Sequence, residues 1–77
     1  MENFTDEELN IAIGQELKKL RTEKGLSKIR VSEMLGVSDV TIGYWESGRS
    51  TISAPRLKSY CKVLNISLSD FFKRIDQ

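Results

Sequence analysis

Apolar side chains recur at helical spacing in the first third of the chain. Separated by four, four and three residues, they form one stripe that consists of Leu9, Ile13, Leu17 and Leu20. This spacing is typical of one side of an α-helix. Thr5 and Glu8 precede the stripe in the pattern of a capping box, where each side chain accepts the other residue's backbone N–H. Gly14 interrupts the stripe and is an alternative place for the helix proper to begin, in place of a start at residue 6.

Three later segments share one start signal. In each, a serine follows one apolar residue and precedes another by four positions, which is the spacing of an N-cap with a hydrophobic staple. The three serines are Ser27, Ser38 and Ser67. A further helix is predicted after Ser53, because Pro55 suits the first turn of a helix. The apolar side of that helix contains Leu57, Cys61 and Leu64.

The complete pattern predicts an all-α domain of five helices. Their predicted ranges are 6–24, 28–35, 39–47, 54–64 and 68–75. Gly25 and Asn65 follow two of the helices and suit the left-handed conformation that ends a helix. No alternating run of β-branched residues is long enough for a sheet. We expect Trp45 and Met34 to pack in the core.

The segment from Ser27 to Glu46 is the most informative part of the sequence. Its two short helices are joined by Gly36-Val37-Ser38, a turn of about three residues that contains glycine, as a helix-turn-helix requires. So short a turn forces the second helix to cross the first steeply and to protrude as a ridge. A ridge of that width fits the major groove of DNA. We therefore predict a helix-turn-helix at about residues 27–46.

Charge is distributed unevenly along the chain, although the formal net charge is only +1. Residues 1–16 contain five acidic side chains and no basic one, whereas all twelve Lys and Arg residues lie in residues 17–77. This asymmetry is compatible with an anionic partner that avoids the acidic end. We predict that residues 1–10 are an acidic extension or the start of the first helix, and that residues 11–77 form the DNA-binding domain.

The composition argues against several classes of protein. Without histidine and with a single cysteine, the chain lacks the commonest metal ligand and the commonest acid–base catalyst. We therefore expect no enzyme, no metal and no cofactor, and we interpret Cys61 as a small buried hydrophobe. One cysteine cannot form an internal disulfide, which favours the cytoplasm. No apolar run approaches the roughly 18 residues of a membrane span, and none resembles a signal peptide.

Six short segments spread over about residues 11–72 carry a family resemblance. They are residues 13–21 (IGQELKKLR), 24–27 (KGLS), 35–38 (LGVS), 41–42 (TI), 45–49 (WESGR) and 64–67 (LNIS). In these segments the chain resembles the phage-repressor/Cro-type (Xre-like) helix-turn-helix family. The resemblance implies a five-helix fold, binding to an operator in double-stranded DNA, and a homodimer. It also implies a structural ion pair between Arg21 and Glu46.

Candidate DNA contacts fall into two groups. The exposed side of the third helix offers base contacts from Asp39, Val40, Thr41, Gly43 and Tyr44. Helix starts and nearby cations offer phosphate contacts from Ser27, Lys28, Arg30, Ser38, Arg49, Ser50 and Thr51. The family often has glutamine where this chain has Lys28, and it usually carries Arg, Lys, Gln or Asn along the reading side.

The reading side of this chain therefore lacks a bidentate base reader. Val40 and Thr41 can contact thymine methyl groups, and Tyr44 can meet a base edge or a phosphate. Asp39 either accepts from a cytosine amino group or only favours the positive end of its own helix. Gly43 either allows close approach of the DNA backbone or is a tolerated exception within a helix.

We expect a DNA-binding transcription regulator, most simply a repressor that binds a near-palindromic operator as a homodimer, with helix 39–47 in the major groove. Its control would come from concentration, dimerisation or a protein partner. The alternative is a protein-interaction module of the same fold, such as an antitoxin, for which residues 1–10 are the only candidate tail. The last helix turns Phe71 inward, so Phe72 or Ile75 either forms the dimer contact or completes the monomer core.

Overall fold

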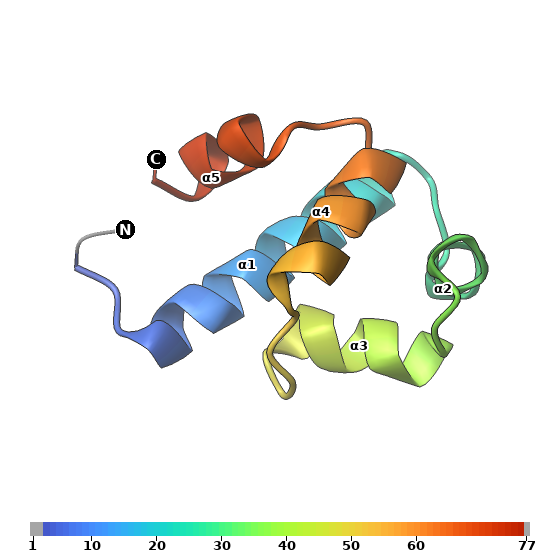
Figure 1. Ribbon diagram of the computed structural model, residues 1–77, viewed down its shortest axis with the longest axis horizontal. Helices are drawn as coiled ribbons and strands as arrows, with labels where there is room; N and C mark the ends of the chain where they lie inside the picture. The colour runs from blue at the N-terminus through green and yellow to red at the C-terminus, as the bar shows by residue number, and fades with distance from the viewer. Residues whose placement is uncertain (1–2, 77) are drawn as a thin grey trace.

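A computed structural model describes residues 3–76, and within them it contains five α-helices and no strand. The helices are α1 (Asp6–Glu23), α2 (Lys28–Leu35), α3 (Asp39–Ser47), α4 (Ala54–Val63) and α5 (Leu68–Asp76). Each bound lies within one residue of the range predicted from the sequence, and the all-α class is confirmed. In Figure 1, α4 crosses in front of α1, α3 lies along the lower edge, and α5 lies along the upper edge. None of the helices in residues 3–76 has both the length and the apolar character needed to cross a membrane.

Local capping explains why the helix starts were predictable. The hydroxyls of Ser27, Ser38, Ser53 and Ser67 each accept the backbone N–H three residues later, at 3.0–3.3 Å. Thr5 and Glu8 form the reciprocal capping box at 3.0 and 3.1 Å, and the hydrogen bonds from Thr5 lower the pKa of the Glu8 carboxyl. A cap of this kind contributes about 1 kcal/mol. With its cap in place, α1 begins at Asp6, so residues 6–13 are helix and not an extension.

Gly14 has a tertiary role that its position in the stripe did not reveal. The helix α1 continues through it without a break, and the residue is buried. Gly14 lies directly under the backbone of α3, because a Cβ added there would be 2.3 Å from the Trp45 carbonyl oxygen. Gly14 is therefore where α1 crosses α3 at close range. The interpretation that the helix begins near Gly14 is wrong.

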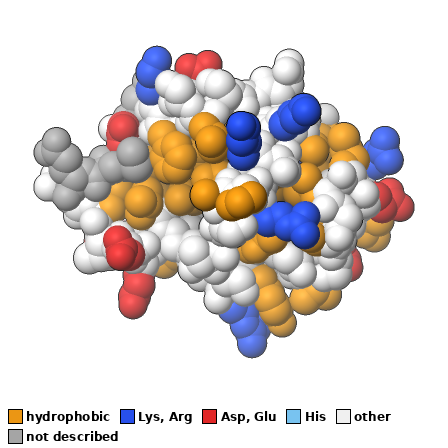
Figure 2. Space-filling view, viewed as in Figure 1, with side chains coloured by type: hydrophobic (Ala, Val, Ile, Leu, Met, Phe, Trp, Pro, Cys, Tyr) orange, Lys and Arg blue, Asp and Glu red, His pale blue; other side chains and the backbone are white. Residues whose placement is uncertain are grey.

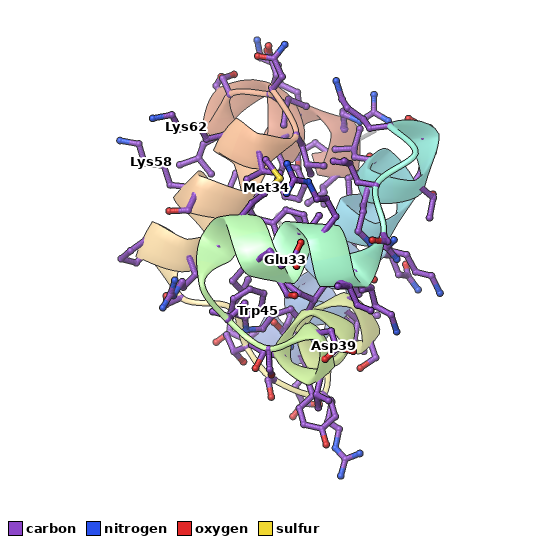
Figure 3. The ribbon with its side chains drawn as sticks, turned by 90° about the vertical axis from the view of Figure 1, so that its right-hand side faces the viewer. Glu33, Met34, Asp39, Trp45, Lys58 and Lys62 are labelled. Carbon is purple, nitrogen blue, oxygen red and sulfur yellow. The ribbon has the colours of Figure 1, made fainter. Side chains whose placement is uncertain are left out.

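All five helices contribute to one core. Its fully buried members include Leu17, Val31, Ile42, Tyr60 and Phe71. Trp45, Leu57, Cys61 and Leu64 are buried as predicted. Met34 is not, because the buried side of α2 is centred on Val31 and Ser32, and Met34 lies at its edge with 48% of its surface exposed. Figure 3 shows Met34 on the side of α2 that faces α4.

Candidate nucleic-acid interface

A tight turn sets the direction of α3. Gly36 ends α2 with φ 69°, in the left-handed region that residues with a Cβ adopt only at a cost. The N–H groups of Gly36 and Val37 both donate to the Ser32 carbonyl, which closes the end of α2. Ser38 then caps α3 by accepting the Thr41 N–H at 3.1 Å. The chain thus changes direction within three residues, and α3 lies at the edge of the molecule (Figure 1).

The helix α3 has one buried side and one outer side. Ile42, Trp45 and Glu46 face the core, whereas 55% of Val40 and 38% of Tyr44 are exposed. Asp39 is also exposed and lies at the start of α3 (Figure 3). The helix therefore brings the predicted base-contacting residues together on its outer half, with Thr41 and Gly43 on its two flanks.

The flanks of α3 differ in character. On one flank, the hydroxyls of Thr41 and Ser38 hydrogen bond to each other at 2.9 Å, so the Thr41 hydroxyl already has a partner within the chain. On the other flank, Gly43 leaves space beneath the Lys28 side chain, whose Nζ would be 3.7 Å from an added Cβ. One side of α3 therefore adjoins hydroxyl groups, and the other adjoins a cation from the start of α2.

The loop after α3 places a cation beside Tyr44. The Arg49 guanidinium lies 4.7 Å from the centre of the Tyr44 ring, in a cation–π contact worth about 0.5–1 kcal/mol at an exposed site. The Ser50 N–H donates to the Tyr44 carbonyl at 3.2 Å, so the backbone of the loop is fixed to α3 as well. Thr51 follows and is exposed. The stacking of Arg49 on Tyr44 could not be predicted from the residue pattern.

The remaining phosphate candidates lie at the start of α2. Ser27 is occupied as the cap of α2, where it accepts the Arg30 N–H. Arg30 approaches Glu33 at 3.8 Å, and because both side chains are more than 60% exposed, this pair contributes little to stability. Lys28 is exposed and makes no ion pair with any residue in 3–76. Lys28 is therefore the cation at the α2 start whose charge is uncompensated.

Behind the outer side of α3, a buried network joins three helices. Arg21 of α1 donates to both carboxylate oxygens of Glu46, at 2.7 and 3.0 Å, and the two side chains are 8% and 4% exposed. Tyr60 of α4 donates to the same carboxylate at 2.7 Å, and Arg21 also donates to the Leu26 carbonyl at 2.8 Å. The family resemblance implied the Arg21–Glu46 pair, but no pattern in the chain indicated the third partner, Tyr60.

The protonation states in this network follow from its hydrogen bonds and burial. The hydrogen bond that Arg21 donates to Glu46 raises the pKa of the Arg21 guanidinium, which stays charged. Burial, reinforced by the hydrogen bond to Glu46, raises the pKa of the Tyr60 hydroxyl, which stays protonated and able to donate. The network therefore holds α3 against α1 and α4 with one compensated charge pair.

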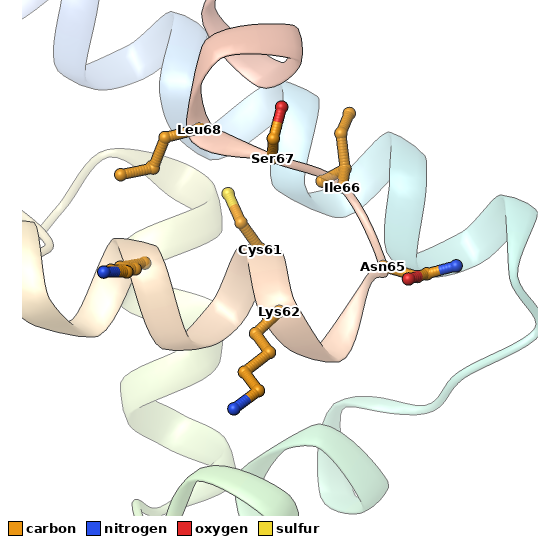
Figure 4. A pocket seen from close by; sticks show the side chains of 7 residues that line it. Cys61, Lys62, Asn65, Ile66, Ser67 and Leu68 are labelled. Carbon is orange, nitrogen blue, oxygen red and sulfur yellow. The ribbon is translucent and has the colours of Figure 1, made fainter.

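Cys61 belongs to α4, which contributes none of the predicted DNA contacts. Its sulfur points into a hollow of about 400 Å³ between α4 and α5, whose lining includes Lys58, Lys62 and Ile66 (Figure 4). Cys61 is only 1% exposed, and burial raises the pKa of its thiol to about 11. A protonated, buried thiol is a poor nucleophile. Within residues 3–76, no cluster of potential metal-binding side chains includes it.

Acidic side chains gather at the start of α1. On the face shown in Figure 2, some acidic side chains lie at the lower left, near the start of α1, others lie at the upper and right edges, and most Lys and Arg side chains lie over the centre and right. The first turn of α1 contains Asp6, Glu7 and Glu8, all of them exposed. The acidic end of the sequence therefore remains a distinct acidic region in the fold.

Comparisons with known proteins agree with this geometry. A family model described as helix-turn-helix matches residues 17–71. An uncharacterized HTH-type transcriptional regulator of Sinorhizobium medicae is 31% identical over 65 residues, which cover 84% of this chain and 47% of that relative. The chain thus spans about half the length of that relative.

Two solved structures share the fold of this chain. The clp gene regulator ClgR from C. glutamicum has a TM-score of 0.83 and 29% identity, covering 88% of this chain and 87% of that one. The restriction-modification controller protein C.AhdI from Aeromonas hydrophila has a TM-score of 0.75 and 29% identity, covering 80% of this chain and 94% of that one. With the matched family model and the turn between α2 and α3, these findings show that the chain belongs to the helix-turn-helix family of phage-repressor/Cro type.

Proposed function

We propose that this protein is a sequence-specific DNA-binding transcription regulator, acting as a repressor. In this proposal it binds a near-palindromic operator as a homodimer, with α3 in the major groove. The observation that carries the proposal is the outer side of α3, where Val40 and Tyr44 are exposed between the cations Lys28 and Arg49. Groups midway along an inserted helix meet base edges, whereas groups at its ends and flanks meet phosphates. The family membership and the names of the relatives support this function.

The chemistry of the outer side predicts what kind of sequence it reads. Because the Thr41 hydroxyl is bonded to Ser38, its methyl group is left to pack against a thymine methyl, as Val40 can. Tyr44, held by the stacked Arg49, offers a hydroxyl to a base edge or phosphate. Asp39 can accept from a cytosine amino group. No side chain on this side forms two hydrogen bonds to one base, so each half-site discriminates only modestly between DNA sequences. Two half-sites, bound by the two copies of a dimer, are needed for high specificity.

Single alanine substitutions distinguish residues that recognise the DNA sequence from residues that contribute to the affinity for any duplex. We expect Tyr44→Ala to cost about 1–3 kcal/mol on the preferred duplex and little on a scrambled one, because a base contact is lost. Lys28→Ala weakens binding to both duplexes similarly and reduces the slope of log K against log salt by about 1, because a phosphate contact is lost. Fluorescence anisotropy at several salt concentrations, with a duplex selected from random DNA, measures both effects.

A matched lysine on another face provides the control for this experiment. Lys62 lines the hollow between α4 and α5, so Lys62→Ala removes the same charge without touching α3. Equal losses on the preferred and scrambled duplexes for Tyr44→Ala would show that Tyr44 contacts a phosphate and does not read sequence. If the parent protein binds no duplex in a salt-dependent manner, the transcription regulator is excluded and the protein-interaction module becomes the better hypothesis.

The proposed dimer contact lies on α5. Phe71 is fully buried, whereas Phe72 and Ile75 are only partly buried, and Phe72 meets the Phe71 ring edge-on at 5.6 Å. In Figure 2, apolar side chains gather left of centre, just below the place of α5 in Figure 1. A second copy related by two-fold symmetry could cover such a surface. These positions support Phe72 or Ile75 as the self-complementary contact.

Charge placed at Phe72 tests this contact. We expect Phe72→Glu to shift the protein from dimer to monomer in sedimentation velocity, because a carboxylate at a two-fold apolar contact meets its own copy. Ser69→Glu, which adds the same charge at an exposed position of α5, should leave the distribution of sedimentation coefficients unchanged. A Phe72→Glu variant that keeps its helical circular dichroism and sediments like the parent would place the dimer contact elsewhere.

A further inference from the structure

A small polar hollow lies where α1, α2 and α3 meet. Its volume is about 190 Å³, and its lining comprises Lys18, Arg21, Lys28, Gly43, Glu46 and Ser47, which we call the three-helix notch. Arg21 and Glu46 bond to each other, so their charges compensate. Lys18 and Lys28 are exposed, and neither forms an ion pair within residues 3–76. The three-helix notch is therefore a hollow with two uncompensated positive charges.

The opening of the notch depends on a glycine that the fold itself does not require. Gly43 lies inside α3, where glycine is destabilising by about 1 kcal/mol relative to alanine. A Cβ added there would have only the flexible end of Lys28 within 4 Å, at 3.7 Å. At Gly14, by contrast, backbone atoms of α3 leave no room for a Cβ. Packing within the chain therefore does not require glycine at position 43. A group from outside the chain that enters the notch would require it, because a side chain at this position would occupy the same space.

We infer that the three-helix notch receives a phosphate group of the DNA backbone, held between the ammonium groups of Lys18 and Lys28. This inference rests on the proposed function, because it assumes that α3 meets DNA. The notch adjoins Gly43 on the flank of α3, and the phosphates on either side of a groove lie at the flanks of an inserted helix. Lysine binds phosphate as a point charge, and two lysines attract one anionic phosphate from both sides.

This inference adds a residue and a helix to the candidate interface. Lys18 belongs to α1 and precedes the helix-turn-helix by nine residues, so motif spacing gave no reason to consider it. The inference also assigns Gly43 the role of allowing the DNA backbone to approach α3 closely, in place of a contact with a base. A phosphate held by Lys18 and Lys28 would be contacted by α1 and α2 together, which fixes the depth at which α3 enters the groove.

Neighbouring lysines on α1 allow a matched test. We expect Lys18→Ala to reduce the slope of log K against log salt by about 1 on preferred and scrambled duplexes alike. Lys19→Ala removes the same charge one residue further on, where the side chain lines a different hollow beside Arg74, and should leave the slope unchanged. Gly43→Ala should melt at or above the parent temperature while binding both duplexes about tenfold more weakly, the effect of losing one charge-assisted hydrogen bond.

The outcomes distinguish this inference from the proposed function. If Lys18→Ala and Lys19→Ala have equal salt slopes, or if Gly43→Ala binds like the parent, no phosphate occupies the notch, even though α3 still binds DNA. If the parent protein itself binds no duplex, the proposed function is overturned, and the phosphate site with it. A smaller slope for Lys18→Ala alone, together with a stable but weakly binding Gly43→Ala, supports the site.

Discussion

Replacing Glu46 with alanine is expected to lower the free energy of unfolding by about 3–5 kcal/mol, the cost of breaking a buried ion pair by removing one partner. The substitution leaves the Arg21 guanidinium, which is buried with its side chain 8% exposed, without its carboxylate. It also removes the acceptor of the Tyr60 hydroxyl, which is fully buried. For a domain of this size, each 1 kcal/mol corresponds to about 4–8 °C in melting temperature. Thermal and urea denaturation at pH 7 measure the loss.

An exposed carboxylate is the appropriate control for Glu46→Ala. Glu33 faces Arg30 at 3.8 Å with 64% of its side chain exposed, so Glu33→Ala should cost less than about 1 kcal/mol. Tyr60→Phe should have an intermediate effect of about 1–3 kcal/mol, because it removes one hydrogen bond but keeps the ring. A Glu46→Ala variant that melts within error of the parent would contradict a stabilising role for the buried pair.

The buried network and the outer side of α3 depend on each other. Glu46 lies on the inner side of the helix whose outer side carries Val40 and Tyr44. Contacts from α1 and α4 to this one carboxylate fix both the position and the rotation of α3. A displacement of about 1 Å is enough to lose a directional hydrogen bond. The rigidity of the inner side of α3 therefore determines how accurately the side chains on its outer side are positioned. In the proposed DNA complex, Glu46 would thus control how accurately α3 is positioned without contacting a base itself.

Local signals explain which parts of the fold were predictable. The serine caps and the Thr5–Glu8 box act between residues three positions apart, so a sequence pattern contains them completely. Burial on α2 was harder to predict. Met34 follows Val31 by three residues, which satisfies helical spacing, but the tertiary packing of α2 buries Val31 and Ser32 and leaves Met34 at the edge of that side.

Tertiary contacts explain which parts of the site were not predictable. The periodicity of α3 is sufficient to assign Val40 and Tyr44 to its outer side. Tyr60 is different, because its spacing to Leu57 and Leu64 predicts burial but says nothing of a hydroxyl partner fourteen residues earlier in the chain. Lys18 likewise joins the three-helix notch only because α1 crosses α3. Such contacts depend on helix crossings, which a pattern along one helix does not specify.

The crossing of α1 and α3 leads to the second large expected effect, that of Gly14→Ala. Helix propensity alone predicts stabilisation, since alanine is favoured over glycine by about 1 kcal/mol inside a helix. The structure predicts the opposite. A Cβ at Gly14 would lie 2.3 Å from the Trp45 carbonyl oxygen and 2.7 Å from that of Glu46. Both atoms belong to the backbone, so no rotation of a side chain relieves the overlap, and α1 and α3 must separate.

We therefore expect Gly14→Ala to lower the free energy of unfolding by about 1–3 kcal/mol, the usual cost of overpacking, despite its better helix propensity. Gly43→Ala is the matched control, because it makes the same exchange inside α3 with only the flexible end of Lys28 nearby, and it should be neutral or stabilising. Urea denaturation of both variants compares the two effects directly. Separation of α1 from α3 also moves Glu46 away from Arg21, so Gly14→Ala combined with Glu46→Ala should destabilise by less than the sum of the two single changes. Equal stability of the two glycine variants would mean that α1 and α3 do not cross at the closeness that Gly14 permits.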